Sequence, residues 1–546
     1  MTTTAIGHYQ VDDTPAARDA YGALFAGTDS RSGDAVYVKA FRPAGPGAAD
    51  RAPADVFAGL LHEALLPPRD EVAVGAERYA VVARPEGEIL AACLDRLRRG
   101  GMAGRHQLLM IILGVARGVE QLHNRRLIHG QVNPTAIVAR CQTPLQAFLL
   151  CFGAAEPLPG HRLIADNPFL PFVAREQLRG GGGQASDIYA LGMLLYAAFS
   201  KHPPFAAATP WETAEQIMWG ECAPFEPLLD DLPPTIGQAV APYLEAVGAV
   251  AGKALHRDPR ARYATVGEMI RLLDDLARRL APVELGIQLY ESRRFELAAA
   301  VLAEATAGPD AARAHLFLGR VYGEGLGDYE KGVAAFRRAL KENPALTSAR
   351  EALADHYARF DHYALAKREI LELLGASPDS IPLMIRYADI LRRAGDAEPA
   401  VNVLRRVAEL NPYHLAARAQ AIRLQIDRQQ FQPAEAECNG ALEVIQKVIH
   451  LGNLNPAEVA EIYTLRARLH RQRRIADRAM NWAHKALDVF PAYADAHVLL
   501  SELHLEAGQT EQAIEHFLAA MSLSSDQGKI LEGLARLLDR PEFRQE

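Results

Sequence analysis

The stretch LIHGQVNPTAI at residues 127–137 decides the fold of the first half of the chain. Directly before it, apolar residues recur at helical spacing over residues 105–123. After it comes FLLCFG at residues 148–153, at a distance that suits a pair of short strands. The pattern therefore predicts a helix, a polar loop and a pair of strands in that order.

Further strands and a buried helix are predicted on both sides of this stretch. Residues 35–41 (AVYVKAF) and 78–83 (RYAVVA) have the β-branched and aromatic content of strands. The glycines at residues 180–183 indicate a flexible loop, and the apolar run at 187–199 predicts a buried helix. Strands and helices are thus mixed in one α+β region.

These segments resemble a eukaryotic-like protein kinase over residues 18–281. The strand VYVK resembles the one that carries the phosphate-binding lysine, here Lys39. Residues 127–137 resemble the catalytic loop, and CFG at 151–153 resembles the D-F-G motif. The resemblance implies a bilobal α+β fold.

Three positions that the resemblance assigns to catalysis carry unsuitable residues. The catalytic aspartate falls on Gln131, whose neutral amide cannot accept a proton. The metal-binding asparagine falls on Ala136, which has no ligand atom, and the metal-binding aspartate falls on Cys151. A thiol is a poor ligand for Mg²⁺, which prefers oxygen. We therefore expect no catalytic residue and no metal at these positions.

The residues that the resemblance assigns to the structural frame are retained. His129 and Phe152 match packing positions, and Asp187 matches a buried anchor of the catalytic loop. Glu176 and Arg262 match an ion pair. Loss of the catalytic set together with retention of this frame is typical of a pseudokinase.

Nucleotide binding is left open by the sequence. The segment YGALFAG at 21–27 keeps two glycines but not the full glycine-rich pattern. The helix expected near residues 50–61 has no glutamate to pair with Lys39, and Glu63 comes after it. No cofactor is expected, and ATP held by Lys39 is the alternative.

From residue 283 onward the strand signals vanish and helix pairs recur about every 34 residues. The second unit has the pattern Gly319, Tyr322, Phe336, Ala339 and Pro344. Small residues of this kind allow two helices to cross closely, and proline ends the second helix. The pattern resembles the tetratricopeptide repeat and implies an all-α solenoid of about seven repeats.

These patterns divide the chain into five parts. They are an N-terminal tail at 1–17, an N-lobe at 18–88, a C-lobe at 89–281, the repeats at 282–530 and a C-terminal tail at 531–546. A chain of 546 residues is too long for one ordinary core, in agreement with several domains.

Composition limits the partners. The net charge of −8 and the pI near 6.2 give no global reason to bind nucleic acid. The five cysteines are scattered, with no C-x-x-C and no histidine nearby at ligand spacing, so neither a disulfide framework nor a structural zinc site is expected, and no metal site is predicted in the chain. No signal peptide or membrane span is predicted, and a cytoplasmic location is expected.

Partner binding is predicted on the repeats, at Arg468 and Arg471. Both lie on the predicted first helix of one repeat and could receive an acidic peptide, or they could form a solvated face. The sequence thus predicts an inactive pseudokinase that serves as a protein-interaction scaffold. The alternative is an atypical nucleotide-binding transferase, or a nucleotide-responsive sensor, that uses the kinase-like cleft.

Overall fold

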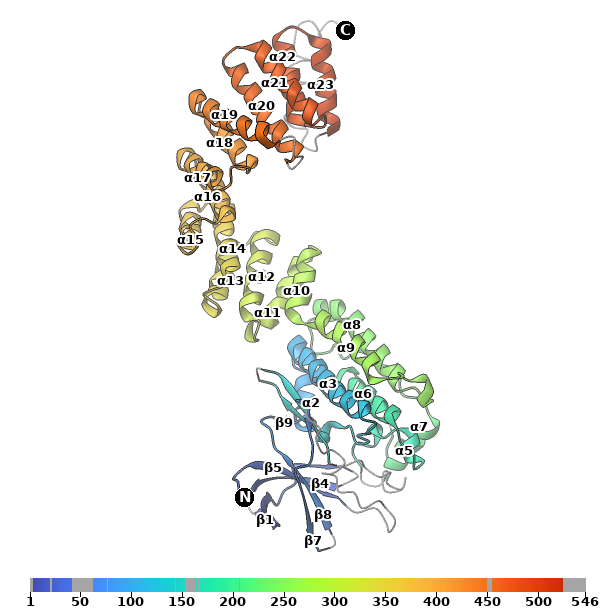
Figure 1. The fold of residues 1–546 in the computed structure, drawn as a ribbon. Helices are drawn as coiled ribbons and strands as arrows, with labels where there is room; N and C mark the ends of the chain where they lie inside the picture. Colours follow the sequence, from blue (N-terminus) through green and yellow to red (C-terminus); the bar gives the residue numbers. More distant parts are fainter. Residues whose placement is uncertain are drawn as a thin grey trace. The chain divides into compact units, whose positions relative to one another are not determined.

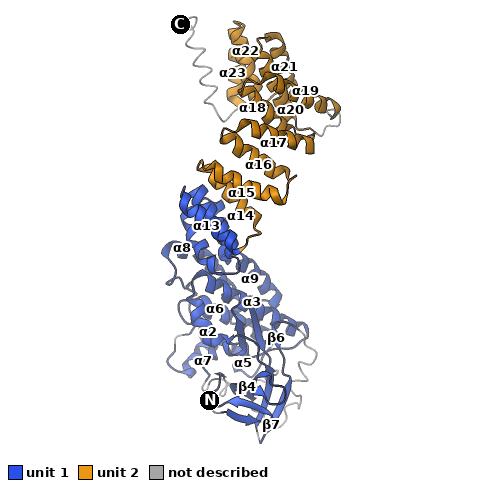
Figure 2. Cartoon of the chain, turned by 90° about the vertical axis from the view of Figure 1, so that its left-hand side faces the viewer, with its two compact units in different colours: residues 1–342 blue, residues 343–546 orange. Residues whose placement is uncertain are grey.

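The computed structural model describes residues 3–19, 22–41, 62–75, 77–142, 144–152, 164, 167–205, 207–448 and 454–523. The chain forms two compact units, residues 1–342 and 343–546 (Figure 2). The predicted helix near 50–61 and the predicted C-terminal tail at 531–546 lie outside the described residues. Gly153 of the predicted D-F-G-like motif also lies outside them.

A seven-stranded antiparallel sheet opens unit 1 (Figure 1). Its order is β1-β2-β4-β5-β8-β7, with β3 paired to β4. The predicted strands at 35–41 and 78–83 are confirmed as neighbours, and Lys39 lies opposite Ala80. The strands are β1 (Thr3–Ile6), β2 (Tyr9–Asp12), β3 (Ala17–Asp19), β4 (Gly22–Asp29), β5 (Ala35–Phe41), β7 (Asp70–Val74) and β8 (Glu77–Ala83).

The prediction of an N-terminal tail at residues 1–17 is wrong, because β1, β2 and the first residue of β3 lie within it and belong to the sheet. Ile6, Tyr9 and Val11 are buried in one cluster with Val36 and other residues of the sheet. The alternation of buried and exposed residues along β2 is that of a half-buried strand. Four residues are too few for this alternation to stand out in the sequence.

A second, four-stranded sheet has the order β6-β11-β10-β9. Its centre is the predicted strand pair, an antiparallel hairpin in which Val138 lies opposite Phe148. The strands are β6 (Leu65–Leu66), β9 (Glu88–Ile89), β10 (Ile137–Arg140) and β11 (Gln146–Leu150). The hairpin follows the loop at 127–137, as the sequence predicts.

Helices make up the next part of unit 1. The predicted helices at 105–123 and 187–199 are α3 and α6, and α6 is buried along nearly its whole length. The α-helices are α2 (Leu90–Arg98), α3 (Gly101–Asn124), α5 (Arg175–Leu178), α6 (Gln184–Phe199), α7 (Pro210–Trp219), α8 (Pro234–Ala254) and α9 (Val266–Leu280). The short 3-10 turns are η1 (Pro134–Ala136), η2 (Leu170–Phe172) and η3 (Pro259–Ala261).

Unit 1 continues past the predicted end of the kinase-like region at residue 281. Leu280, Val283, Val301 and Leu318 belong to the same hydrophobic core as α3 and α6. The added elements are α10 (Pro282–Glu291), α11 (Phe295–Glu304), η4 (Ala305–Ala307), α12 (Ala311–Arg320), the π-helical turn η5 (Val321–Gly325) and α13 (Tyr329–Glu342). The first two helix pairs are therefore part of the same compact unit as the kinase-like region.

Unit 2 consists of further helix pairs. Small residues such as Ala354, Ala366, Ala388 and Ala400 are almost completely buried, as close helix crossings require. The helices are α14 (Thr347–Arg359), α15 (Tyr363–Ala376), α16 (Ile381–Arg393), α17 (Ala397–Leu410), α18 (Leu415–Asp427), α19 (Phe431–Val448), α20 (Pro456–Gln472), α21 (Ala476–Val489), α22 (Ala494–Glu506) and α23 (Thr510–Leu523). With α10–α13 they give seven consecutive helix pairs among the described residues.

No helix in the described part of the chain combines the length and the apolar character needed to cross a bilayer.

Candidate functional site

Lys39 on β5 forms a buried ion pair with Asp19 at the end of β3. Its Nζ lies 2.6 Å from Asp19 Oδ2, and each side chain is 5% exposed. The other oxygen, Asp19 Oδ1, accepts a hydrogen bond from the Gly22 backbone N–H at 3.2 Å. β3 pairs with β4 and β4 pairs with β5, so the pairing of the strands brings the carboxylate to the lysine. Lys39 therefore has its partner on β3, just before the segment at 21–27, while Glu63 is exposed.

The same lysine also contacts the loop that resembles the catalytic loop. Lys39 Nζ donates to Gln131 Oε1 at 3.4 Å and lies 5.3 Å from the centroid of the Phe152 ring. The Thr135 hydroxyl donates a hydrogen bond to Asp19 Oδ2 at 3.4 Å. The ion pair is thus enclosed by side chains from this loop and from the segment after β11.

The remaining kinase-like positions offer no metal ligands of a suitable kind. Ala136 is 3% exposed within the turn η1. Cys151 is fully buried, its thiol donates to the Leu149 carbonyl at 3.7 Å, and burial raises its pKa to about 12. Mg²⁺ requires oxygen ligands, so these residues do not fit a Mg²⁺–ATP site. A nucleotide phosphate at Lys39 would also have to displace Asp19.

The two glycines expected to cover a phosphate lie on strand β4 instead of in a loop. At Gly22, where φ is +153°, an added Cβ would collide with the Ala40 carbonyl oxygen. At Gly27 it would collide with the Gln10 carbonyl oxygen. Both glycines are accounted for by close approach of neighbouring strands.

Asp187 on α6 forms hydrogen bonds with the loop at residues 127–137. Its carboxylate accepts backbone N–H bonds from His129 at 2.9 Å and Gly130 at 2.7 Å, and lies 2.8 Å from His123 Nε2. His129 Nε2 donates to the Leu150 carbonyl at 3.1 Å, which ties the loop to β11. Burial lowers the pKa of His129, so the ring is neutral and serves as a hydrogen-bonding link.

Glu176 and Arg262 form a two-fold ion pair, with distances of 2.7 and 3.1 Å. The Ser186 hydroxyl donates to Glu176 Oε1 at 2.8 Å, and Arg262 also donates to the Ala185 carbonyl at 2.8 Å. Burial alone would raise the pKa of Glu176, but its bonds to Arg262 outweigh burial and lower it. The pair joins α5 to the start of α6 and to the segment before α9.

A cavity of about 200 Å³ lies beside this ion pair. Its lining includes Arg175, Tyr189, Cys222 and Arg257. The Tyr189 hydroxyl is buried and has no hydrogen-bond partner among the described residues. The cavity was not predicted, because its lining comes from separate segments between residues 175 and 262 that carry no recognisable motif.

The two arginines predicted to bind a partner lie on α20. Arg471 donates to Glu506 Oε1 at 2.7 and 2.9 Å and also pairs with Glu502. Arg468 lies 3.7 Å from Asp495. These acids belong to α22, the first helix of the next pair. An acidic ligand would therefore compete with carboxylates of the chain itself.

Comparison with known proteins agrees with both parts of the fold. Residues 312–346 and 494–527 match the tetratricopeptide repeat family. A probable serine/threonine-protein kinase of Corynebacterium efficiens is 29% identical over 206 residues, which are 37% of this chain and 29% of that protein. Serine/threonine-protein kinase PknL of Mycobacterium tuberculosis is 25% identical over 241 residues, 43% of this chain and 56% of that protein.

The chain is thus a kinase-like protein with repeats: a protein-kinase-like domain is joined to a series of tetratricopeptide repeats. It spans 29% and 56% of the lengths of these two kinases. A solved tetratricopeptide repeat protein from Parabacteroides merdae is 18% identical, covers 47% of this chain and 98% of its own, and has a TM-score of 0.36.

Proposed function

We propose that the chain is a pseudokinase that serves as a protein-interaction scaffold through its repeats. The observation that carries this proposal is the buried pair of Lys39 and Asp19, because it occupies the lysine that a kinase needs for the nucleotide phosphates. Gln131, Ala136 and Cys151 support it by residue type. The relatives are named as kinases, so the proposed loss of activity rests on residues of this chain.

The cost of opening the pair makes ATP a weak ligand. A phosphate at Lys39 would separate the buried Asp19 carboxylate from the lysine ammonium. Leaving one partner of a buried pair uncompensated costs about 3–5 kcal/mol. That is a loss of roughly a hundred- to several-thousand-fold in affinity.

The repeats provide the binding surface of the proposed scaffold. Stacked helix pairs form extended surfaces on which proteins and peptides bind. The first helices of successive pairs carry arginines and carboxylates that face one another, such as Arg386 with Glu351 at 3.4 Å and Arg423 with Glu461 at 2.6 Å. A protein or peptide that carries both signs of charge can replace these contacts. Its acidic groups would bind the arginines and its basic groups would bind the carboxylates.

Binding of ATP to the full-length chain tests the first half of the proposal. We expect no shift in melting temperature with millimolar ATP, with or without Mg²⁺ or Mn²⁺, and no phosphate transfer. The variant Asp19→Asn frees the lysine and should gain ATP binding without gaining transfer. Metal-dependent transfer that is abolished by Lys39→Met would refute the proposal. ATP binding by the unchanged chain without transfer would favour the nucleotide-responsive sensor.

Charge reversal on the repeats tests the second half. Proteins retained by the full-length chain are compared with those retained by Arg468→Glu, whose ion pair with Asp495 is long and exposed. Arg279→Glu, an exposed change in unit 1, is the matched control. We expect a partner that is lost with Arg468→Glu and kept with Arg279→Glu. Identical retention by all three proteins would count against a partner site at Arg468.

A further inference from the structure

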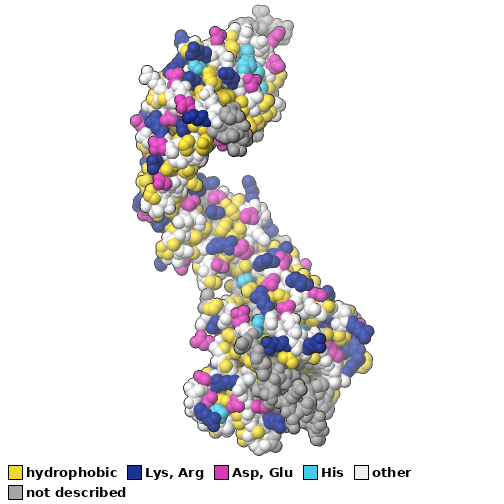
Figure 3. Space-filling model, in the orientation of Figure 1, with side chains coloured by type: hydrophobic (Ala, Val, Ile, Leu, Met, Phe, Trp, Pro, Cys, Tyr) yellow, Lys and Arg dark blue, Asp and Glu magenta, His cyan; other side chains and the backbone are white. Residues whose placement is uncertain are grey.

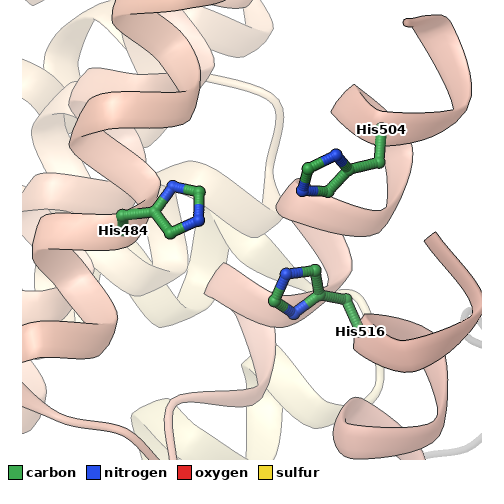
Figure 4. Close-up of side chains that lie close together, drawn as sticks. All are labelled: His484, His504 and His516. Atoms are coloured by element: carbon green, nitrogen blue, oxygen red, sulfur yellow. The ribbon is translucent and has the colours of Figure 1, made fainter. Parts of the chain in front are cut away.

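Four histidines gather on the last two helix pairs of unit 2. His484 lies on α21, His497 and His504 on α22, and His516 on α23. One ring nitrogen from each of His484, His504 and His516 lies within 4.8 Å of the other two. Figure 4 shows these three rings pointing toward one another from three helices. Figure 3 shows histidine side chains (cyan) on the visible face over the same end of the unit.

Hydrogen bonds fix which nitrogen carries the proton on two of these rings. His484 Nδ1 lies 2.8 Å from the Met480 carbonyl oxygen, which can only accept, so Nδ1 is the donor. His504 Nδ1 lies 2.7 Å from Gln509 Oε1 and is a donor for the same reason. In the neutral tautomer with its proton on Nδ1, each ring has its lone pair on Nε2, where it can bind a metal. Such an outer hydrogen bond is the usual support of a metal-binding histidine.

His497 fixes the third ring in the same way. Its Nε2 lies 3.0 Å from the Pro491 carbonyl oxygen and donates to it, which leaves Nδ1 as an acceptor. His516 Nδ1 lies 3.0 Å from this acceptor and therefore donates to it. The Nε2 lone pair of His516 is then free as well. His497 thus orients His516 in the way that the Met480 carbonyl orients His484 and the Gln509 amide orients His504.

The three rings differ in their exposure to solution. His504 is 8% exposed, whereas His484 is exposed. A metal ion can therefore reach the cluster from the side of His484.

We propose that His484, His504 and His516 bind one divalent transition-metal ion of the type that prefers imidazole, with Zn²⁺ as the expected ion. Three histidines with an open fourth position are a known zinc ligand set, and zinc–nitrogen bonds are about 2.0–2.1 Å. In a tetrahedron such bonds place the nitrogens roughly 3.3 Å apart. Rotation of the exposed His484 ring can supply the small approach that this requires. The ion would join α21, α22 and α23 across the last two helix pairs.

Titration of the metal-free full-length chain with Zn²⁺ tests the site. We expect one ion per chain by calorimetry and a rise in the melting temperature of unit 2. His484→Gln should weaken binding more than tenfold, because it removes one of three ligands. His484 is exposed, so this variant should fold, and retained helicity by circular dichroism checks that it does. His202→Gln, at an exposed histidine of unit 1, should leave binding unchanged.

Co²⁺ provides a second readout that reports on geometry. Tetrahedral Co²⁺ bound to the site should give a visible absorption band that is absent in His484→Gln and weaker in His497→Gln. The proposal is overturned if Zn²⁺ binds the unchanged chain no more tightly than His484→Gln. It is also overturned if Co²⁺ gives the same spectrum with both proteins.

Discussion

Lys39 keeps the residue type of a kinase lysine but has a different set of contacts. Its ammonium is held by Asp19, Gln131 and the face of Phe152, all within the fold. A residue that would bind phosphate in a kinase therefore contributes here to the stability of unit 1. A change that inactivates a kinase should consequently destabilise this chain.

Lys39→Met should destabilise unit 1 by about 3–5 kcal/mol, because it removes the ammonium that pairs with the buried Asp19 carboxylate. The double variant Lys39→Met with Asp19→Leu should recover most of that loss, since apolar residues can replace a buried ion pair. Urea denaturation measures both. Lys201→Met, at an exposed lysine, should cost no more than about 1 kcal/mol. Equal instability of the single and double variants would contradict this interpretation.

His516 should make the stability of unit 2 depend on pH. Its pKa of about 4 in the folded chain lies below the ordinary value of 6.5. The folded state thus binds the proton more weakly than the unfolded state, so stability is full above about pH 6.5 and falls as the pH drops toward 4. His484, His497, His504 and Glu515 are the titratable groups that act on it.

The urea midpoint of metal-free unit 2 should therefore fall between pH 7.5 and pH 4.5. His516→Gln should reduce this change relative to the unchanged chain. An undiminished pH dependence in His516→Gln would show that other groups cause it.

Neither the ion pair nor the histidine cluster was predicted, for different reasons. Asp19 lies on a three-residue strand, and its position beside Lys39 depends on the pairing of three strands. The histidines have no regular spacing, since three neighbouring helices bring them together. Their density is the signal that could have found them, because four of the 18 histidines lie within residues 484–516.

At the scale of the elements, α3 begins with a contact from the first repeat. The carboxylate of Glu304, at the end of α11, accepts a hydrogen bond from the Met102 backbone N–H at 2.8 Å. This group is one of the N–H donors that a helix leaves without an internal partner. The negative charge also lies at the favourable end of the helix dipole. A residue of the repeats thus caps the central helix of the kinase-like part.

Glu304→Ala should therefore destabilise unit 1 by about 0.5–2 kcal/mol, as loss of a cap does. Faster hydrogen exchange in the first turn of α3 would locate the effect. Glu296→Ala, at an exposed acid on the same helix α11, should leave that exchange unchanged. Equal exchange in both variants would show that the cap is not important for α3.

Elements were predictable where apolar periodicity is long or β-branched residues are dense. The helices α3 and α6 and the strands β5 and β8 have such patterns. β1 and β2 have only four residues each and are stabilised by the sheet they join. The second repeat contains the π-helical turn η5, a feature that the spacing of the repeat pattern does not predict.

At the scale of the whole molecule, two compact units predict two unfolding transitions. Zn²⁺ should raise the transition of unit 2 alone, because a ligand stabilises the part that binds it. Lys39→Met should lower the transition of unit 1 alone. Calorimetry of the full-length chain, with hydrogen exchange to identify each transition, measures both. A single transition that both changes shift together would contradict this independence.

The sequence predicts the two classes of structure but places the change between them near residue 282. The repeat pattern starts there because it reflects the local geometry of the helix pairs. The extent of the compact unit depends instead on packing, and the hydrophobic core that contains α3 also includes residues of α10, α11 and α12. The first two repeats therefore have the sequence pattern of the repeats but pack into the hydrophobic core of the kinase-like region.

This shared core has a consequence for the history of the gene. A recombination event that joined a new series of repeats at residue 282 would replace Val283 and Val301, uncover the core residues that they contact and remove the Glu304 cap on α3. An exchange near residue 342 would leave that core intact. Descendants with different numbers of repeats should therefore differ after the second repeat, and the first two should be inherited together with the kinase-like part.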